Sequence, residues 1–302
     1  MKVLIAGGTG QIGRLLVNRL MEDGHAVWVL SRNPQKANLP LGAQVVGWDG
    51  RSPVGWQHIL EQVDAVVNLT GENLGAARWS VQRKAILRSS RLEPAQAIGN
   101  AISAASHRPA LLLQSSAIGI YGIGKGQEVD ENSPAGNDSL SQLVVDWEKS
   151  SLPVEKLGVR RIVVRQGIVL DDREGALPRM LLPFRLFAGG PVGSGKQWIS
   201  WISRKDIADA ILFLLKSETA NGVFNLTSPQ PLTNAEFGRT IARVLKRPYW
   251  MPVPAFILRM LFGEMAIVVL EGQRAIPSRL IESGFRFKYA NLKSALEELF
   301  GH

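Results

Sequence analysis

The sequence predicts an α/β protein, a Rossmann-like doubly wound parallel sheet with a small C-terminal lobe. Two observations predict this fold class. Short runs of β-branched and aliphatic residues alternate with longer stretches in which apolar residues recur at helical spacing, which is the pattern of βαβ units. The 302 residues are 45% hydrophobic and 20% charged, so the chain has enough apolar material to bury a large core.

Seven short apolar runs are the predicted strands. They are Val3–Ala6, Ala26–Leu30, Ala43–Gly47, Ala65–Leu69, Leu111–Gln114, Arg161–Val164 and Val223–Leu226, the last at the sheet edge. Four stretches of helical periodicity lie between them, namely Ile12–Glu22, Ser80–Ser106, Leu140–Leu157 and Lys205–Lys216. This order predicts one parallel sheet with helices on both faces.

The composition changes after Gly167, where glycine and proline interrupt any regular alternation. We therefore expect a Rossmann domain from residues 1–167 with 204–228, and a substrate-binding lobe from residues 168–203 with 229–302. The most hydrophobic late stretch, Val253–Leu270, contains Arg259 and Glu264. It is therefore expected to be a buried or amphipathic helix rather than a membrane span.

The composition excludes several kinds of site. There is no cysteine, which removes disulfides and thiolate chemistry. The four histidines lack metal-ligand spacing, so no metal site is expected. Without a convincing targeting segment or membrane span, we expect a cytoplasmic protein. The formal net charge of +9 suits an anionic ligand, although a generic basic surface would give the same value.

A glycine-rich turn follows the first predicted strand and opens the first helix. The spacing of its glycines permits a tight turn, close approach of the backbone to a pyrophosphate and close packing of helix on strand. The helix N-terminus then presents free N–H groups and the positive end of its dipole to the phosphates. We expect a dinucleotide here, contacted by Gly7, Thr9, Gly10, Gln11, Ile12 and Gly13.

The end of the second predicted strand discriminates between the two nicotinamide dinucleotides. An NAD site places an acid there to bind the ribose 2′-hydroxyl. This chain instead has Ser31 and Arg32, and no acid occurs between Asp23 and Asp49. A guanidinium can bind a 2′-phosphate and stack on adenine. NADP is therefore the predicted cofactor, with a solvated loop residue as the alternative role of Arg32.

Motifs throughout the chain resemble the extended short-chain dehydrogenase/reductase superfamily, the group of nucleotide-sugar epimerases and dehydratases. They are GGTGQIG near the N-terminus, NLTG at 68–71 and SSAIGIYG at 115–122. GEN at 71–73, DWE at 146–148 and GGPVGSGKQWISWI at 189–202 resemble, more specifically, its atypical NADP-dependent epimerase family, which includes proteins linked to inhibition of cell division. The resemblance implies an NADP domain, a C-terminal substrate lobe, and Leu69, Thr70 and Gly71 beside the cofactor.

The superfamily's chemistry uses a tyrosine as acid/base and a lysine four residues later, which lowers the phenol pKa and binds the nicotinamide ribose. A glutamate commonly lies four residues after that lysine. If Glu148 is this glutamate, the lysine position is Val144 and the tyrosine position is Leu140. The superfamily's serine or threonine position falls on Ala117, beside Ser116. The resemblance therefore implies that all three usual functional positions are vacated.

Three other side chains are candidates for catalysis. Tyr121 and Lys125 reproduce the Tyr-x-x-x-Lys spacing, but their segment is rich in glycine and a poor helix, so we expect Tyr121 to be structural. Glu72 follows the predicted cofactor loop, and Ser116 lies beside the vacated serine position. Weak acid/base help is expected from Glu72, Ser116 or a water.

Five cations, from Arg78 to Arg91, occur within fourteen residues that contain no acid. Such a run is usually a solvated basic face. This helix follows the fourth strand, however, so its first turns should border the ligand cleft, and we expect Arg91 to contact a phosphate or the cofactor. Nucleic-acid binding is not expected, because the run has no interleaved aromatic residues and the chain has no known nucleic-acid-binding fold.

The sequence leaves two functions open. The first is an NADP-dependent oxidoreductase or epimerase-like enzyme of atypical mechanism, acting on an unidentified small molecule. The second is a non-catalytic NADP(H)-binding regulator, for example of cell division. The retained cofactor motif and substrate lobe favour the first, and the joint loss of tyrosine, lysine and serine favours the second. A homodimer and a regulatory protein partner are both left open.

Overall fold

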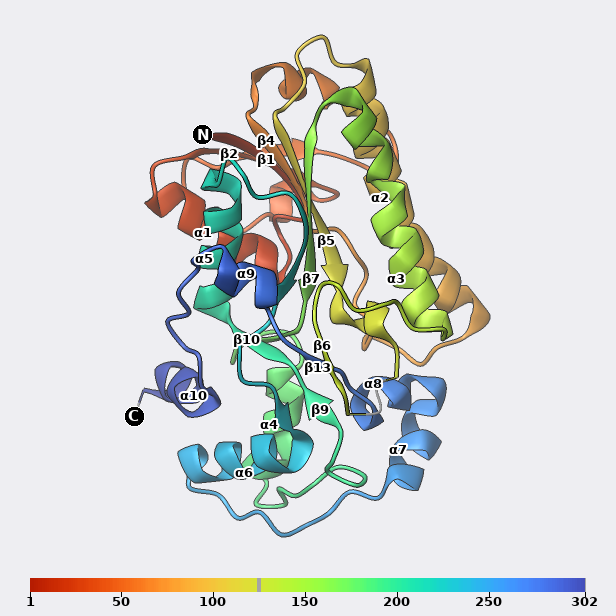
Figure 1. Cartoon of the computed structure of the whole chain (residues 1–302), viewed down its shortest axis with the longest axis vertical. Helices are drawn as coiled ribbons and strands as arrows, with labels where there is room; N and C mark the ends of the chain where they lie inside the picture. The colour runs from red at the N-terminus through yellow and green to blue at the C-terminus, as the bar shows by residue number, and fades with distance from the viewer. Residues whose placement is uncertain (124–125, 302) are drawn as a thin grey trace.

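The structure is a computed structural model that describes residues 1–123 and 126–301. Its centre is a seven-stranded sheet of order β11-β7-β5-β4-β1-β2-β3, in which every pairing is parallel (Figure 1). The strands are β1 (Lys2–Ala6), β2 (Ala26–Ser31), β3 (Gln44–Gly47), β4 (Ala65–Asn68), β5 (Leu111–Ala117), β7 (Arg160–Gln166) and β11 (Gly222–Leu226). The strand order reverses between β1 and β4, where sheets of this kind bind ligands at the carboxyl ends of the strands.

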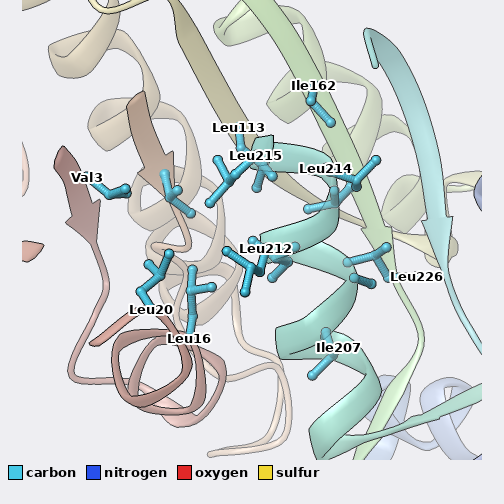
Figure 2. Packing of buried hydrophobic residues seen from close by; sticks show 14 of the residues in the cluster. Val3, Leu16, Leu20, Leu113, Ile162, Ile207, Leu212, Leu214, Leu215 and Leu226 are labelled. Atoms are coloured by element: carbon cyan, nitrogen blue, oxygen red, sulfur yellow. The ribbon is translucent and has the colours of Figure 1, made fainter. Parts of the chain in front are cut away.

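Helices cover both faces of the sheet (Figure 1). α1 (Gln11–Glu22) and α5 (Arg204–Lys216) pack on one face, where Leu16 and Leu212 belong to the buried cluster drawn in Figure 2. α2 (Val81–Ala104) and α3 (Ser139–Ser150) lie on the opposite side. Neighbouring residues of one strand face opposite layers, so Leu113 joins the first cluster and Leu112 the second. Burial on both faces explains why the strands read as continuous apolar runs.

The C-terminal part has an apolar core of its own, in which Trp201 and Phe237 are buried. Its helices are α4 (Leu177–Arg185), α6 (Asn234–Leu245), α7 (Ala255–Phe262), α8 (Ile267–Leu270), α9 (Ser278–Glu282) and α10 (Leu292–Phe300). Three short strand pairs join the segments: β6 (Glu128–Val129) with β13 (Arg274–Ala275), β8 (Ile168–Leu170) with β10 (Trp201–Ser203), and β9 (Trp198–Ile199) with β12 (Leu232–Thr233). The 3₁₀ turns are η1 (Pro34–Lys36), η2 (Gln57–Gln62), η3 (Ile118–Tyr121), η4 (Leu152–Leu157) and η5 (Gly263–Ala266).

The fold class and the seven predicted strands are confirmed, but two predicted helices were wrong. The helix expected over Leu140–Leu157 ends at Ser150, and η4 follows it, because Pro153 has no N–H with which to continue an α-helix. The stretch Val253–Leu270 divides into α7, η5 and α8, with Gly263 at φ +59° between the first two. Its apolar side chains are mixed in exposure, since Leu258 is buried whereas Phe256 is 68% exposed.

The predicted division into residues 1–167 with 204–228 and 168–203 with 229–302 stays a prediction. One segment of the second group packs on the sheet, since Leu280 of α9 is buried in the same cluster as α5 and β11. Within the described part of the chain, no helix is both long and apolar enough to cross a membrane. The described residues also contain no group of three or more acidic or histidine side chains placed to hold a metal ion.

Candidate cofactor and substrate site

The glycines of the first turn differ in what surrounds them. Gly7 has φ +80°, and a Cβ on it would lie 2.8 Å from the carbonyl carbon of Leu69. A Cβ on Gly13 would lie 2.2 Å from the carbonyl oxygen of Gly7. A Cβ on Gly10 would meet only that same oxygen within 4 Å, at 3.3 Å. Packing of strand, helix and neighbouring loop thus requires Gly7 and Gly13, whereas Gly10 faces open space.

The N-terminus of α1 opens directly beside Gly10. Gly10 is its N-cap and supplies no capping side chain, and the first turn contains no acid. The first N–H groups of the helix are therefore left for a ligand or solvent. A distant segment borders the same turn, because Gln11 donates from Nε2 to the carbonyl oxygen of Glu174 at 3.1 Å and Arg14 forms an ion pair with the Glu174 carboxylate.

Strand β2 ends at the residues expected to select the cofactor. Ser31 is buried, and its Oγ accepts a hydrogen bond from the N–H of Asn33 at 3.2 Å. Arg32 is exposed at the carboxyl end of the strand. Within residues 1–123 and 126–301, its guanidinium has no hydrogen-bond or ion-pair partner. Its long side chain is therefore available to an anionic group at this edge of the sheet.

The turn after β4 is organised by a fully buried amide. Asn68 donates from Nδ2 to Oε1 of Gln114 at 2.9 Å, and its Oδ1 accepts from both the N–H and the hydroxyl of Thr70. These bonds satisfy the polar atoms that a buried amide must pair. They hold Leu69, Thr70 and Gly71 at the carboxyl end of β4, with the Leu69 carbonyl against Gly7.

Three arginines hold the loop that follows this turn. Arg91 donates from Nη2 to the carbonyl oxygen of Glu72 at 3.1 Å, and Arg83 donates to the Glu72 carboxylate at 3.3 Å. Arg179 of α4 donates to the carbonyl oxygen of Gly75 at 2.6 Å. The loop is therefore anchored both to α2 and to the C-terminal part. Glu72 remains half-buried.

Arg91 lies directly behind Gly71. Its guanidinium is 5.1 Å from the centre of the Trp147 ring, and a Cβ on Gly71 would be 3.6 Å from its Cζ. Burial lowers the pKa of the Arg91 guanidinium to about 10. Among the residues that the structure describes, no carboxylate lies within ion-pair distance of it, and its terminal nitrogens donate to the carbonyl oxygens of Leu87 and Glu72. Its contact with the cofactor stays a prediction.

A buried polar network joins β5, α3, β7 and β11. The hydroxyl of Ser116 donates to the Glu148 carboxylate at 2.6 Å, and Arg165 binds both oxygens of that carboxylate, at 2.8 and 3.0 Å. Arg165 also donates to the hydroxyl of Tyr121 at 3.1 Å, and Tyr121 donates to Oδ1 of Asn225 at 2.7 Å. Burial raises the pKa of the Tyr121 phenol, against the influence of Arg165. The hydroxyls of Ser116 and Tyr121 are thus both engaged inside the protein.

Tyr121 ends the turn η3, and Gly122 after it has φ +76°. Gly122 therefore does not continue a helix from Tyr121. A regular α-helical turn would be needed to bring the side chains of Tyr121 and Lys125 to one face. Lys125 itself lies outside the described residues. The interpretation of Tyr121 as a structural tyrosine stays a prediction, and its bonds to Arg165 and Asn225 support it.

A cavity of about 550 Å³ lies between α2, the start of α3 and the segment from α7 to α8. Its walls include Trp79, Lys84, Leu140, Arg259, Ile267 and Leu270. Leu140 is thus in the cavity wall, whereas Val144 is buried in a small apolar cluster with Tyr121. The resemblance assigns the position of Leu140 to the catalytic tyrosine, so the side chain that lines the cavity there is aliphatic.

Two contacts link α2 and the residues just before it to the segment from α7 to η5. Lys84 of α2 forms an ion pair with Glu264 of η5, and Arg78 donates to the carbonyl oxygen of Met260 at 3.2 Å. Both cations belong to the basic run of the sequence. Instead of presenting one solvated face, this run divides among the cavity wall, the loop after β4 and solvent.

Sequence reasoning missed the residues that reach the site from far along the chain. Arg165 binds Glu148, Arg179 binds the loop after β4, and Arg259 with Ile267 completes the cavity wall. No spacing pattern connects them with their partners, because the contacts arise only from tertiary packing. Asp138, which caps α3 and also lines the cavity, was missed as well. An Asp before a helical stretch is the local signal that could have found it.

Comparison with known proteins agrees with this geometry. The model of the NAD dependent epimerase/dehydratase family matches residues 3–227, and that of a domain of unknown function (DUF1731) matches residues 253–299. The chain is 37% identical to the epimerase family protein YfhF of Bacillus subtilis (strain 168), over 99% of this chain and 98% of that protein. It is 40% identical to the chloroplastic SDR39U1 homolog of Arabidopsis thaliana, over 99% of this chain and 86% of that protein.

A solved structure is similar over the whole length. The crystal structure of human epimerase family protein SDR39U1 (isoform 2) with NADPH superposes with a TM-score of 0.88 at 35% sequence identity, and the match covers 100% of both chains. The similarity thus includes the C-terminal part as well as the sheet. This chain belongs to the NAD dependent epimerase/dehydratase family.

Proposed function

We propose that this protein binds NADP(H) and is an oxidoreductase of the epimerase type that works without the usual Tyr-x-x-x-Lys pair. The observation that carries the proposal is the open backbone at Gly10, beside the uncapped first turn of α1. A pyrophosphate fits such a place because free N–H groups and the helix dipole both favour an anion. The NADPH in the human SDR39U1 structure supports the same cofactor here.

The preference for NADP(H) rests on Arg32. Its exposed guanidinium extends from the carboxyl end of β2, where an NAD site would have an acid. Ser31 would lie beside the adenine ribose, and Arg32 would bind its 2′-phosphate. Charge-assisted hydrogen bonds of this kind contribute about 1.5–3 kcal/mol each.

The remaining cofactor contacts come from two turns. Thr9, Gln11 and Ile12 would surround the pyrophosphate at the start of α1, together with the glycines. Leu69, Thr70 and Gly71 would face the cofactor from the carboxyl end of β4. Arg91, whose buried charge has no carboxylate partner among the described residues, would stabilise the negative charge of the cofactor from behind Gly71.

When bound, the nicotinamide cofactor accepts or donates the hydride. The chain's own residues would orient the substrate in the cavity beside Leu140 and exclude water from it. Glu72, Ser116 and Tyr121 are the candidates for moving a proton. Of the three, only Glu72 is partly exposed, with 31% of its side chain accessible. The hydroxyls of Ser116 and Tyr121 are already hydrogen-bonded within the buried network.

A non-catalytic NADP(H)-binding regulator is the second candidate function. The observation that favours it is the aliphatic Leu140 in the cavity wall, with Val144 buried one turn further along α3. Turnover of NADPH with any member of a broad panel of carbonyl compounds and sugar nucleotides would reject the regulator. Tight NADPH binding with no oxidation across the panel would reject the enzyme.

The cofactor proposal is tested by calorimetry with NADPH and NADH. We expect wild type to bind NADPH at least about tenfold more tightly, and Arg32→Ala to lose most of that preference while keeping its affinity for NADH. Lys36→Ala, an exposed cation a short way along the same loop, is the matched control and should leave the preference intact. Equal affinities of wild type for both dinucleotides would contradict the assignment.

A further inference from the structure

The C-terminal ends of α4 and α6 meet at a surface that the proposed function does not use. Figure 1 shows both helices in the part of the molecule remote from the labelled N-terminus. Trp250 donates from Nε1 to the carbonyl oxygen of Phe187 at 3.0 Å, and the guanidinium of Arg247 lies 4.4 Å from the centre of the Phe187 ring. The α4–α6 corner is the surface formed by Arg185, Leu186, Phe187, Lys246, Arg247 and Trp250.

The apolar side chains of the α4–α6 corner point largely into solvent. Leu186 is 68% exposed, Phe187 54% and Trp250 62%. The three cations of the corner are exposed as well. Single exposed apolar residues are ordinary, but several together on one surface mark an interaction site. The corner therefore offers aromatic and aliphatic groups interleaved with positive charge.

The backbone of the corner is unusual in a second, independent way. Phe187 has φ +60° and Lys246 has φ +52°, and no other non-glycine residue in the described ranges has a positive φ. Glycine is the common residue at such helix ends, and a bulky side chain is rare there. Their exposed side chains gain little packing within the chain. Strained backbone of this kind concentrates at functional surfaces.

The two sequence segments that form the corner contain cations and no acids. The sequence has no Asp or Glu between Glu174 and Asp206, and none between Glu236 and Glu264. The second interval nevertheless contains five cations, of which Lys246 and Arg247 belong to the corner. A partner that carries negative charge would therefore complement this surface.

We propose that the α4–α6 corner docks on the surface of an anionic phospholipid bilayer. Tryptophan and phenylalanine enter the boundary between headgroups and acyl chains, and Arg and Lys reach back to the phosphates. Two copies of the chain meeting at this corner would oppose like charges. A nucleic acid would use the cations and rings but would give no role to the exposed Leu186. Lying on the surface agrees with the lack of a membrane-spanning helix in the described residues.

The test is flotation of the full chain with vesicles of phosphatidylcholine, alone or with about one third phosphatidylglycerol. We expect partitioning to be at least about tenfold stronger with the anionic lipid, and to fall steeply when salt is raised from 0.1 M to 0.5 M, because salt screens the attraction. Equal partitioning into both kinds of vesicle, or none into either, would overturn the proposal without any variant.

Variants locate the surface. We expect partitioning to weaken at least about tenfold in each of two variants. One removes charge, Arg185→Gln/Lys246→Gln/Arg247→Gln, and the other removes apolar side chains, Leu186→Ser/Trp250→Ser. The matched controls are Lys36→Gln/Lys156→Gln/Arg286→Gln for charge and Leu41→Ser/Val54→Ser for exposed apolar residues, and both should bind as wild type does. Unchanged NADPH affinity shows that each variant is folded and separates this proposal from the cofactor assignment.

Two results would place the surface elsewhere or give it another partner. If the charge controls lose as much binding as the corner variants, net charge alone attracts the protein to the membrane. If light scattering shows a dimer that the corner variants dissociate, the corner is an interface between copies of the chain. Either outcome rejects the docking proposal.

Discussion

The three glycines of the first turn have separate physical tasks. The structure leaves no room for a Cβ at Gly13, 2.2 Å from the Gly7 carbonyl oxygen, whereas one at Gly10 would be 3.3 Å from that oxygen with no other atom within 4 Å. Gly13 therefore allows α1 to pack against the turn after β1. Gly10 keeps a surface clear above the start of the helix. Substitution should separate folding from ligand binding.

We expect Gly13→Ala to lower the free energy of unfolding by about 1–3 kcal/mol, because the helix must move away from the strand. Gly10→Val should change it by no more than about 1 kcal/mol, yet abolish NADPH binding, because its side chain fills the space above the turn. Urea unfolding and calorimetry measure the two effects. Wild-type NADPH affinity in Gly10→Val would show that the pyrophosphate lies elsewhere.

At the scale of one element, the start of α3 connects helix stability to the cavity. The Asp138 carboxylate accepts from the N–H groups of Leu140 and Ser141, both at 3.0 Å, and from the Ser141 hydroxyl at 2.7 Å. This cap sets where α3 begins and so holds Leu140 at the cavity wall. Burial opposes ionisation of the carboxyl, but the hydrogen bonds from Ser141 and Leu140 outweigh it and lower the pKa of Asp138.

We expect Asp138→Ala to lower the free energy of unfolding by about 1 kcal/mol at pH 7, the usual contribution of an N-cap. Because the folded pKa is lowered, this stabilisation is complete above the unfolded pKa of about 3.9 and is lost as the pH falls through the folded value. The stability difference from wild type should therefore shrink in acid. Asp138→Asn, which keeps an acceptor oxygen, should lose less at pH 7. If Asp138→Asn lowered the free energy of unfolding as much as Asp138→Ala does, the N-cap could not be the cause of the loss.

At the scale of the whole molecule, the cavity forms because the C-terminal part folds back against α2 and the start of α3. Its wall combines α2, α3 and the segment from α7 to α8. Arg179 links α4 to the loop after β4, and Lys84 links α2 to η5. Each contact joins segments more than a hundred residues apart in the sequence. The glycine-rich turn, by contrast, connects the first strand to the first helix directly, although Leu69 and Glu174 border it.

Binding at that turn should stabilise the whole chain. If the cofactor proposal holds, NADPH at one hundred times its dissociation constant raises the free energy of unfolding by about 2.7 kcal/mol. The same concentration of NADH should give about 1.4 kcal/mol less if it binds tenfold more weakly. Urea unfolding with each dinucleotide measures this difference. Gly10→Val, with its turn obstructed, should show no stabilisation by either.

The sequence by itself determined the parallel sheet and the cofactor turn, because both depend on local patterns. Apolar runs such as Val3–Ala6 specify buried strands, and the spacing of the glycines that follow specifies the turn. The assignment of Leu140 to the position where the superfamily has its tyrosine stays a prediction. The same local reasoning failed at Val253–Leu270, since apolar composition does not reveal which side chains find a partner.

Only the tertiary structure decided which polar groups meet. Ser116 donates to Glu148, which Arg165 also binds, and Tyr121 is bonded to Arg165 and Asn225, although nothing in their spacing relates them. Arg91, whose expected contact with a phosphate or the cofactor stays a prediction, lies buried behind Gly71 and donates to two backbone carbonyls. A side chain's partner depends on segments brought together from distant parts of the chain, so its chemistry is settled by the completed fold rather than by its neighbours in sequence.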